Sequence, residues 1–290
     1  MARTSSPEQD CPPPGRVHPR LVAGSTLALA LALYLAVNFL VVFVLFPSGV
    51  LRVLAGPTGG LVSSTLVANA VVMVSVLGVL RWKSGLGAAD VGLASRGVAA
   101  GAVVTALSWA GINLFQALWG FHVDARVQPD TSWTQFGALH TVGVFLAQLL
   151  GNALFEEILF RGVLFEQLRL RLLSRGTGAA MSLLLALLPS QALFALIHVP
   201  LRLSSGMPLE ALPGELALLF GLGVLLAMVY WRTANLYVCV GIHALSNAPL
   251  LAVKQQVDIS SNGMIAAVAS VAVLLLWPRS LARGRLVRRA

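Results

Sequence analysis

Charged residues are scarce in this chain. Asp, Glu, Lys and Arg make up 11% of its 290 residues, whereas hydrophobic residues make up 57%. Because a soluble domain carries about 25% charged residues, the composition excludes a soluble globular protein and indicates an integral membrane protein. The apolar stretches are also not separated by long polar linkers, which favours one polytopic bundle over several separate domains.

Cysteine is nearly absent, with Cys11 in a polar segment and Cys239 in an apolar one. The sequence has no CxxC pair and no Cys/His cluster, so it predicts neither a disulfide framework nor a thiolate metal site. The HExxH zinc motif is missing as well. The net charge of +9 does not indicate a nucleic-acid partner. Most basic residues lie beside apolar runs, a pattern that suits an anionic membrane surface.

Eight apolar stretches are candidate membrane spans, each of which needs about 20 residues. They are predicted at 21–46, 59–80, 97–119, 137–165, 178–199, 214–231, 235–253 and 262–277. The fold prediction is therefore an all-α, polytopic membrane helical bundle of about eight transmembrane helices. Pro189 should kink or break the fifth span. Residues 1–20 are polar and Pro-rich, so we expect them to form a disordered cytoplasmic tail.

The basic residues predict how this bundle is oriented. With the N-terminus in the cytoplasm, fifteen of the twenty Lys and Arg residues fall in cytoplasmic segments. Five of these are the C-terminal Arg279, Arg283, Arg285, Arg288 and Arg289. External segments hold only Arg52, Arg126, Arg202 and Lys254. This positive-inside bias predicts an even number of spans and places both termini in the cytoplasm.

The fourth predicted span contains acidic residues within an otherwise apolar sequence. Its segment NALFEEILFRG includes Glu156, Glu157 and Arg161, although an ionisable side chain in hydrocarbon costs roughly 2.5–3.5 kcal/mol. Glu157 and Arg161 have the i,i+4 spacing of an ion pair. Glu156 lies about 100° further round the helix, and a desolvated, unpaired carboxylate suits a general base. A purely structural Glu–Arg–Glu network is the alternative.

Polar side chains on two other spans could complete a site with Glu156. His198 lies at the end of the fifth span, while His243 and Asn247 share one face of the seventh. A carboxylate and an imidazole can activate water, and a second imidazole with an amide can stabilise an oxyanion. Each group also has a simpler interpretation. His198 could be an interfacial or packing residue, and the other two could form ordinary helix–helix hydrogen bonds.

These residues resemble three motifs of one known family. EEILFRG, at 156–162, is similar to the EExxxR motif of the CPBP intramembrane endopeptidases. This is the CAAX-protease and bacteriocin-processing family, also called Abi, which includes the type II CAAX prenyl endopeptidases. FALIH, at 194–198, resembles the family's FxxxH motif, and HALSN, at 243–247, resembles its HxxxN motif. The motifs occur in the family's order.

The resemblance implies a division of the chain and a role for each motif residue. It predicts N-terminal transmembrane helices at 21–135, a CPBP-like catalytic core at 136–254, and a last helix with a basic tail at 255–290. It implies an intramembrane endopeptidase with Glu156 as the base that activates water, His198 assisting it, His243 and Asn247 binding the oxyanion, and Glu157 and Arg161 as a structural ion pair.

A metal must also be weighed, since the family has been described as metallopeptidases. A catalytic zinc needs three protein ligands, which Glu156, His198 and His243 could supply. In that case no carboxylate is left as the base unless Glu157 leaves Arg161. A glutamate mechanism without metal or other cofactor is therefore favoured, and zinc is the alternative.

Two other functions are open. The Glu/His cluster could be a proton or ion relay of a transporter or channel, although no inverted repeat is visible. The chain could also be a non-catalytic membrane scaffold. An endopeptidase would have as partners the lipid bilayer and a peptide or protein with a membrane-embedded or lipid-attached segment, and no nucleic acid. The Ala- and Arg-rich composition is typical of a GC-rich bacterial source, so we expect the plasma membrane of a bacterium.

Overall fold

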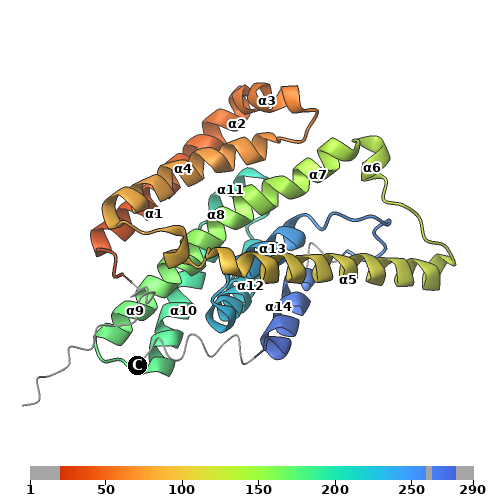
Figure 1. The fold of residues 1–290 in the computed structure, drawn as a ribbon. Coiled ribbons are helices and arrows are strands. Elements are labelled where there is room, and N and C mark those ends of the chain that lie inside the picture. The colour runs from red at the N-terminus through yellow and green to blue at the C-terminus, as the bar shows by residue number, and fades with distance from the viewer. Residues whose placement is uncertain (1–19, 259–262, 279–290) are drawn as a thin grey trace, which may run out of the picture.

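The structure is a computed structural model that describes residues 20–258 and 263–278 (Figure 1). Its regular elements are helices, joined by loops and by one isolated β-bridge between Pro129 and Val253. The predicted tail at 1–20, except Arg20, and the five C-terminal arginines lie outside the described residues. The all-α fold class predicted from composition is confirmed.

Within residues 20–258 and 263–278, six helices are long and apolar enough to cross a membrane, and they match the first six predicted spans. The first contains α1 (Gly24–Leu40), η1 (Val41–Leu45) and α2 (Phe46–Ser48), and the short α3 (Val50–Ala55) follows it. The others are α4 (Ser64–Ser84), α5 (Val98–Asp124), the composite helix Ala138–Ser174, α10 (Ala179–Leu196) with α11 (Val199–Ser204), and α12 (Leu212–Thr233). A short α6 (Ser132–Gln135) precedes the fourth. These helices confirm the polytopic bundle.

The seventh and eighth predicted spans are shorter than expected. They are α13 (Leu236–Asn247) and α14 (Met264–Leu276). α13 ends where Ala248 takes an extended conformation, with φ −147° and ψ 89°, because the proline at 249 disfavours a helical residue before it. α14 ends at Leu276, because Trp277, which precedes Pro278, is extended for the same reason. The prolines thus exclude 248–253 of the seventh predicted range and Trp277 of the eighth from their helices.

The fourth span is longer than predicted and contains two π-helical segments. It consists of α7 (Ala138–Leu146), η5 (Ala147–Asn152), α8 (Ala153–Glu157), η6 (Ile158–Phe165) and α9 (Glu166–Ser174). The segments η5 and η6 are π-helical, a wider geometry that often marks functional sites. The prediction ended this helix at 165 because charged residues follow. Arg169 nevertheless stays on the helix, where its guanidinium pairs with Glu166 at 2.7 Å.

The fifth span is not broken at Pro189, where the sequence predicted a kink or a break. α10 continues through this residue, and the helix pauses only at Ile197 and His198. The Ser190 hydroxyl donates to the carbonyl groups of Ala186 and Leu187, at 2.7 and 3.0 Å. Side-chain bonds of this kind help a membrane helix to accommodate a proline.

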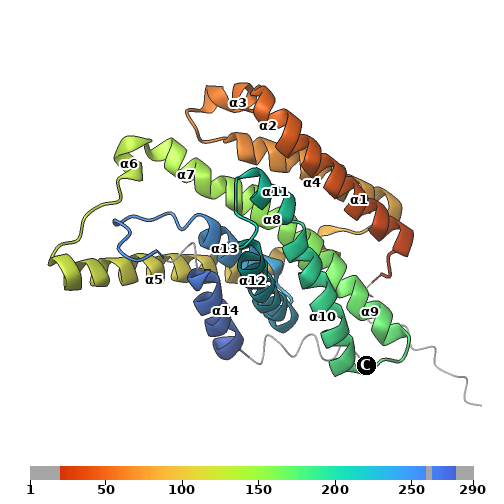
Figure 2. The same cartoon turned by 180° about the vertical axis from the view of Figure 1, so that it is seen from behind.

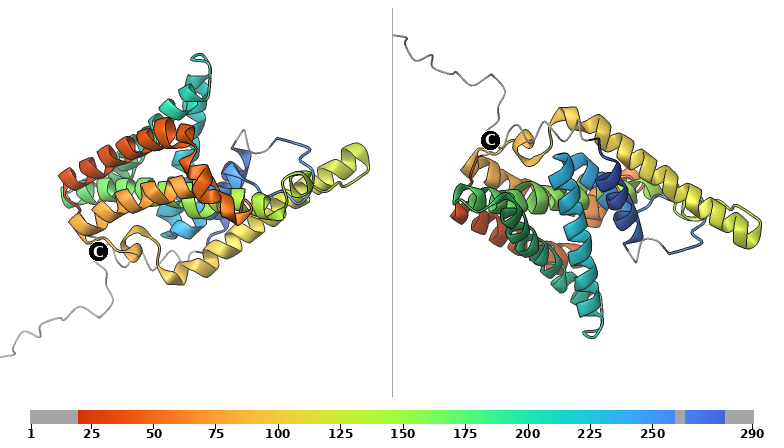
Figure 3. Two further views of the ribbon diagram at one scale, coloured as in Figure 1. Left: turned by 90° about the horizontal axis from the view of Figure 1, so that it is seen from above. Right: turned by 90° about the horizontal axis from the view of Figure 1, so that it is seen from below.

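The fourth span runs through the centre of the molecule (Figures 1 and 2). α4 packs against η5 on one side, while α13 packs against η5 and α8 on another. α10 returns beside η6 and α9. Figure 3 shows α5 along one edge of the bundle, where it packs against α13. The acidic doublet in α8 is therefore enclosed by helices from both halves of the chain.

Small residues allow α5 and α13 to approach closely. A Cβ atom added at Gly241 would lie 1.7 Å from the Thr105 Oγ1, and one added at Gly101 would lie 2.4 Å from the Tyr237 Cβ. Both positions therefore require glycine. Close contact through small residues is a common way to hold membrane helices together, and here it holds α13 against α5.

Two groups of contacts show which ends of the spans lie together. Near the start of α1, the Val22 backbone N–H donates to the Gln167 Oε1 at 2.8 Å, and the Arg171 guanidinium donates to the Val22 carbonyl. At the other ends, the backbone N–H of Asp130 donates to the Ala252 carbonyl oxygen at 3.1 Å. Both contacts agree with the predicted alternation of cytoplasmic and external loops along the chain. Which end faces the cytoplasm stays a prediction.

Candidate active site

The acidic doublet is buried in the middle of the fourth span. Glu156 is 5% exposed, and Glu157 and Arg161 are fully buried. The Arg161 Nη1 lies 3.0 Å from the Glu157 Oε1, so the i,i+4 pair expected from the sequence is present. The Arg161 guanidinium also lies 4.2 Å from the centre of the Phe194 ring. These contacts leave Glu156 without a cation beside it on its own helix.

Glu157 has a second partner that its sequence spacing did not reveal. The His243 Nδ1 lies 2.8 Å from the Glu157 Oε1, the same oxygen that contacts Arg161. When this nitrogen donates its proton to the carboxylate, the neutral ring presents the lone pair of Nε2 on its other side. That Nε2 lies 3.7 Å from the Glu156 Oε2. Glu157 thus orients an imidazole toward Glu156.

His198 approaches Glu156 from α10. Its Nδ1 lies 2.7 Å from the Phe194 carbonyl oxygen, a contact in which the ring nitrogen donates. The Nε2 on the other side of the ring lies 4.0 Å from the Glu156 Oε1. The two histidines therefore present the same ring atom to the two oxygens of one carboxylate.

The length of the fourth span explains why His198 reaches this depth. In the predicted spans, His198 lies at the end of 178–199, whereas Glu156 lies well inside 137–165. The structure continues the fourth helix to Ser174 and starts α10 at Ala179. Nearly equal lengths of helix then separate Glu156 and His198 from the turn between them, so the two residues come level.

Asn247 does not contact Glu156. It follows His243 by one turn of α13, is exposed, and donates from Nδ2 to the Gln148 Oε1 at 3.0 Å. Sequence reasoning missed Gln148. The available signal was the repeat of polar residues at Gln148, Asn152 and Glu156, each four positions apart.

Aromatic rings surround the polar cluster. Tyr34 of α1 packs against Phe155, with ring centres 5.2 Å apart, and against Phe160 at 6.4 Å. Phe194 contacts Phe160 at 5.2 Å and the His198 ring at 4.9 Å. The contribution of Tyr34 was not foreseen, because the first span carries no recognisable pattern. This shell excludes bulk water from the carboxylates, which strengthens their electrostatic interactions.

The histidines and Glu156 lie wider apart than the ligands of a bound zinc ion. Ligand atoms of a tetrahedral zinc, each bonded at about 2.0–2.1 Å, lie about 3.4 Å from one another. The Glu156 oxygens lie 3.7 and 4.0 Å from the two Nε2 atoms. Among the described residues, no group of three or more His, Cys, Asp or Glu side chains is arranged to hold a metal ion.

Glu156 does offer a place for a small hydrogen-bond donor. Its buried Oε2 has no hydrogen-bond partner among the described residues, and a buried polar atom without a partner is costly. A water molecule can donate to this oxygen and also to an imidazole Nε2. The arrangement can therefore bind and deprotonate water.

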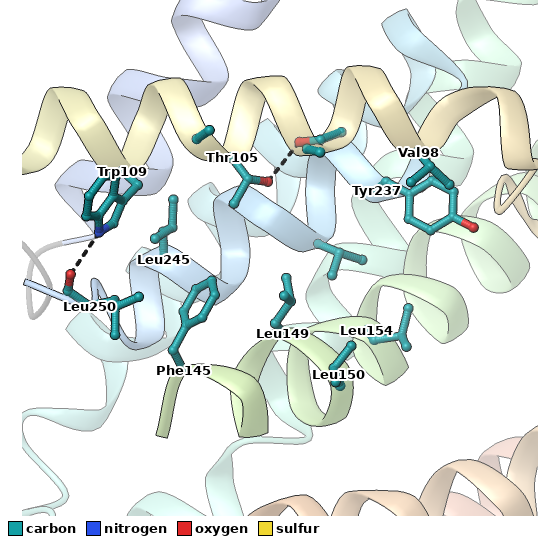
Figure 4. Close-up of a pocket in the computed structure, with 14 residues that line it drawn as sticks. Val98, Thr105, Trp109, Phe145, Leu149, Leu150, Leu154, Tyr237, Leu245 and Leu250 are labelled. Carbon is teal, nitrogen blue, oxygen red and sulfur yellow. Dashed lines mark hydrogen bonds between the residues drawn. The ribbon is translucent and has the colours of Figure 1, made fainter. Parts of the chain in front are cut away.

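A separate apolar cavity of about 430 Å³ lies between α5, the fourth span and α13. Figure 4 shows Phe145, Leu149 and Leu245 among the side chains that line it. Leu245 follows His243 by two residues, so the two side chains point to nearly opposite sides of α13. The lining contains no acidic residue and no histidine. This cavity is therefore distinct from the polar cluster.

Comparison with known proteins supports the motif resemblance. Residues 137–249 match the family of type II CAAX prenyl endopeptidase Rce1-like proteins. Comparison with curated proteins and with solved structures gave no match. The matched segment extends from the start of the fourth span to the end of α13, and the family supports an intramembrane endopeptidase of the CAAX type in general. The match to residues 137–249 supports the assignment of this part of the chain to the CPBP and CAAX protease family.

Proposed function

We propose that the protein hydrolyses a peptide bond beside a membrane-embedded or lipid-attached segment, using a water molecule that Glu156 activates. The observation that carries this proposal is the position of Glu156. It is buried between the Nε2 atoms of His198 and His243, and one of its oxygens has no hydrogen-bond partner among the described residues. A general base needs such a free acceptor within reach of water.

The reaction begins with a water bound at Glu156. The carboxylate takes one proton from this water while the oxygen attacks the carbonyl carbon of the substrate, and His198 helps to orient the water. The carbonyl oxygen becomes an oxyanion in the tetrahedral intermediate. Protonated Glu156 then gives its proton to the leaving nitrogen, the C–N bond breaks, and the carboxylate is restored. Base and acid roles of one group typically contribute about 10²–10⁴-fold.

His243 binds the oxyanion only when its Nε2 carries a proton. Because Nδ1 already donates to Glu157, this form is the imidazolium. The Glu157 carboxylate contacts both this ring and the Arg161 guanidinium, so its single negative charge is shared between them. Asn247, one turn further along α13, supplies an N–H donor to the same oxyanion. The proposed roles of Glu157 and Arg161 are to hold and charge His243, and they do not contact the substrate.

No metal is part of this mechanism. A zinc held by Glu156, His198 and His243 is the alternative, and it would require each of the three side chains to move closer to a common centre. Chelation separates the two mechanisms, because only the zinc mechanism loses activity and regains it with added zinc.

Purified protein in detergent tests the function directly. One probe is a peptide with a prenylated cysteine followed by aliphatic residues, and a second is an apolar transmembrane peptide without a lipid. We expect cleavage of at least one probe and its loss in the Glu156→Gln variant. Glu210→Gln, the same change in an exposed position, is the matched control and should be fully active.

The same preparation separates the proposal from its alternatives. If neither probe is cleaved, and sealed vesicles containing the protein show proton-coupled uptake, the relay hypothesis is favoured. If the peptides bind but are neither cleaved nor transported, the hypothesis of a non-catalytic scaffold is favoured. Cleavage by Glu156→Gln at the wild-type rate would refute Glu156 as the base.

A further inference from the structure

Gln148 lies outside the three family motifs, yet it holds one of their residues. The Asn247 Nδ2 donates to the Gln148 Oε1 at 3.0 Å. The contact joins η5 of the fourth span to the last turn of α13, two segments that pack against each other. Among the described residues, this is the only side-chain hydrogen bond recorded for Asn247. The direction of the Asn247 amide therefore depends on Gln148.

The π-helical segment η5 explains how Gln148 comes into line with the site. Gln148 precedes Glu156 by eight residues, which is more than two α-helical turns of 3.6 residues. The wider turn of η5, which covers Ala147–Asn152, reduces this excess rotation because each of its turns takes up more residues. Gln148 thus faces α13 on the side that carries Asn247, as Glu156 faces His243.

The chemistry of a primary amide makes this contact important. The Asn247 nitrogen has two N–H donors, and its carbonyl oxygen is an acceptor. One N–H donates to Gln148, and the second is left for another acceptor. If the amide rotated by half a turn, its oxygen would take the place of this donor and would repel an oxyanion. An acceptor on Gln148 holds the amide in the orientation that binds an anion.

We propose that Gln148 is a positioning residue that fixes the Asn247 amide, so that its second N–H is directed to the oxyanion of the peptide-bond hydrolysis. This inference rests on the proposed function, and specifically on Asn247 as an oxyanion donor. It adds a residue of the fourth span, two turns before the acidic doublet, to the groups that govern the rate. Gln148 acts through Asn247 and does not contact the reacting atoms.

Two substitutions of Gln148 separate the acceptor from the bulk of the side chain. Gln148→Met keeps the length of the side chain and removes the acceptor, whereas Gln148→Glu keeps an oxygen that accepts from Asn247. We expect Gln148→Met to lower kcat about 10- to 100-fold with little change in KM, since misorienting a donor costs less than the 10²–10³-fold typical of removing it. Gln148→Glu should stay within about threefold of wild type. Gln135→Met, at an exposed position before the span, is the control.

A double variant tests whether Gln148 acts through Asn247. Once Asn247→Ala has removed the donor, the further change Gln148→Met should have no effect on kcat. Multiplied losses in the double variant would overturn the proposal, as would an unchanged kcat in Gln148→Met or a defect confined to KM. If Gln148→Met does not fold, Gln148→Glu decides alone, because activity as low as that of Asn247→Ala would contradict the inference.

The outcome also distinguishes this inference from the proposed function. If the proposed function is wrong, the wild-type protein cleaves neither probe, so there is no cleavage rate for Asn247→Ala to lower. If only the inference is wrong, the wild type cleaves, Asn247→Ala is slow, and Gln148→Met is as active as the wild type.

Discussion

Replacing Glu157 by Gln should slow the enzyme without stopping it. The Glu157 Oε1 accepts from His243 at 2.8 Å and contacts Arg161 at 3.0 Å. Gln at this position keeps an oxygen for both donors but loses the negative charge. The bond to the His243 imidazolium then has a charge on the donor alone, so the loss is at most the difference between a charge-assisted bond of about 1.5–3 kcal/mol and a neutral one of about 0.5–1.5 kcal/mol.

The rate follows from this difference. If the lost 1–1.5 kcal/mol appears in the transition state, in which His243 is charged, cleavage slows by roughly 5- to 15-fold. Glu156→Gln removes the base itself and should cost about 10²–10⁴-fold or more. The two variants make the same chemical change in adjacent residues, so the ratio of their rates reports the roles of the two carboxylates.

The assay is initial-rate cleavage of the probe peptide by purified variants, normalised to the folded fraction measured by thermal unfolding. Normalisation matters because Glu157→Gln also leaves the buried Arg161 without its counter-charge. An inactive Glu157→Gln beside an active Glu156→Gln would reverse the assignment of the doublet. Equal and complete loss in both variants would show that the two carboxylates act as one unit, and the mechanism would have to be rewritten.

Further predictions concern stability, the oxyanion, metal and topology. Arg161→Ala should lower the thermal stability and yield, because removing one partner of a buried ion pair costs about 3–5 kcal/mol. A stable but inactive variant would instead place Arg161 at the substrate. Asn247→Ala should fold normally and lower kcat about 10²–10³-fold, so wild-type activity would remove it from the oxyanion site. Chelators should leave cleavage unchanged, whereas loss with recovery on adding zinc would establish the metal mechanism. Reporters inserted near Asp130 and Asp258 should be external and one inserted at 175–178 cytoplasmic, and the reverse pattern would invert the topology.

Sequence alone could predict features that lie within one helix. The apolar runs predicted the first six spans because their length and composition depend only on local sequence. The i,i+4 spacing predicted the pair of Glu157 and Arg161 because both residues belong to one helix. The three motifs predicted which segments carry the site, but the roles of their residues stay predictions.

Contacts between helices could not be predicted in the same way. The bond from His243 to Glu157 depends on the rotation and depth of α13, which the close packing of Gly241 against Thr105 helps to fix. The contact between Gln148 and Asn247 depends on π-helical turns, for which the sequence has no simple signal. The depth of His198 relative to Glu156 depends on where the fourth span ends. The charged residues after 165 made this span look shorter than it is.

The short length of α13 bears on how water, the second reactant of a hydrolysis, reaches a site inside a membrane. A helix of 12 residues extends about 18 Å, well short of a hydrocarbon layer about 30 Å thick. Asn247 is exposed at its end, and beyond it the carbonyl groups of Leu250 and Leu251 accept hydrogen bonds from the Trp109 and Trp133 side chains, at 2.9 and 2.7 Å. Protein side chains thus cover backbone groups that lipid tails would leave unpaired. Because the helix ends so early, we expect water to reach the exposed Asn247 at the end of α13, so that the turn which ends the helix also opens the route by which water enters the site.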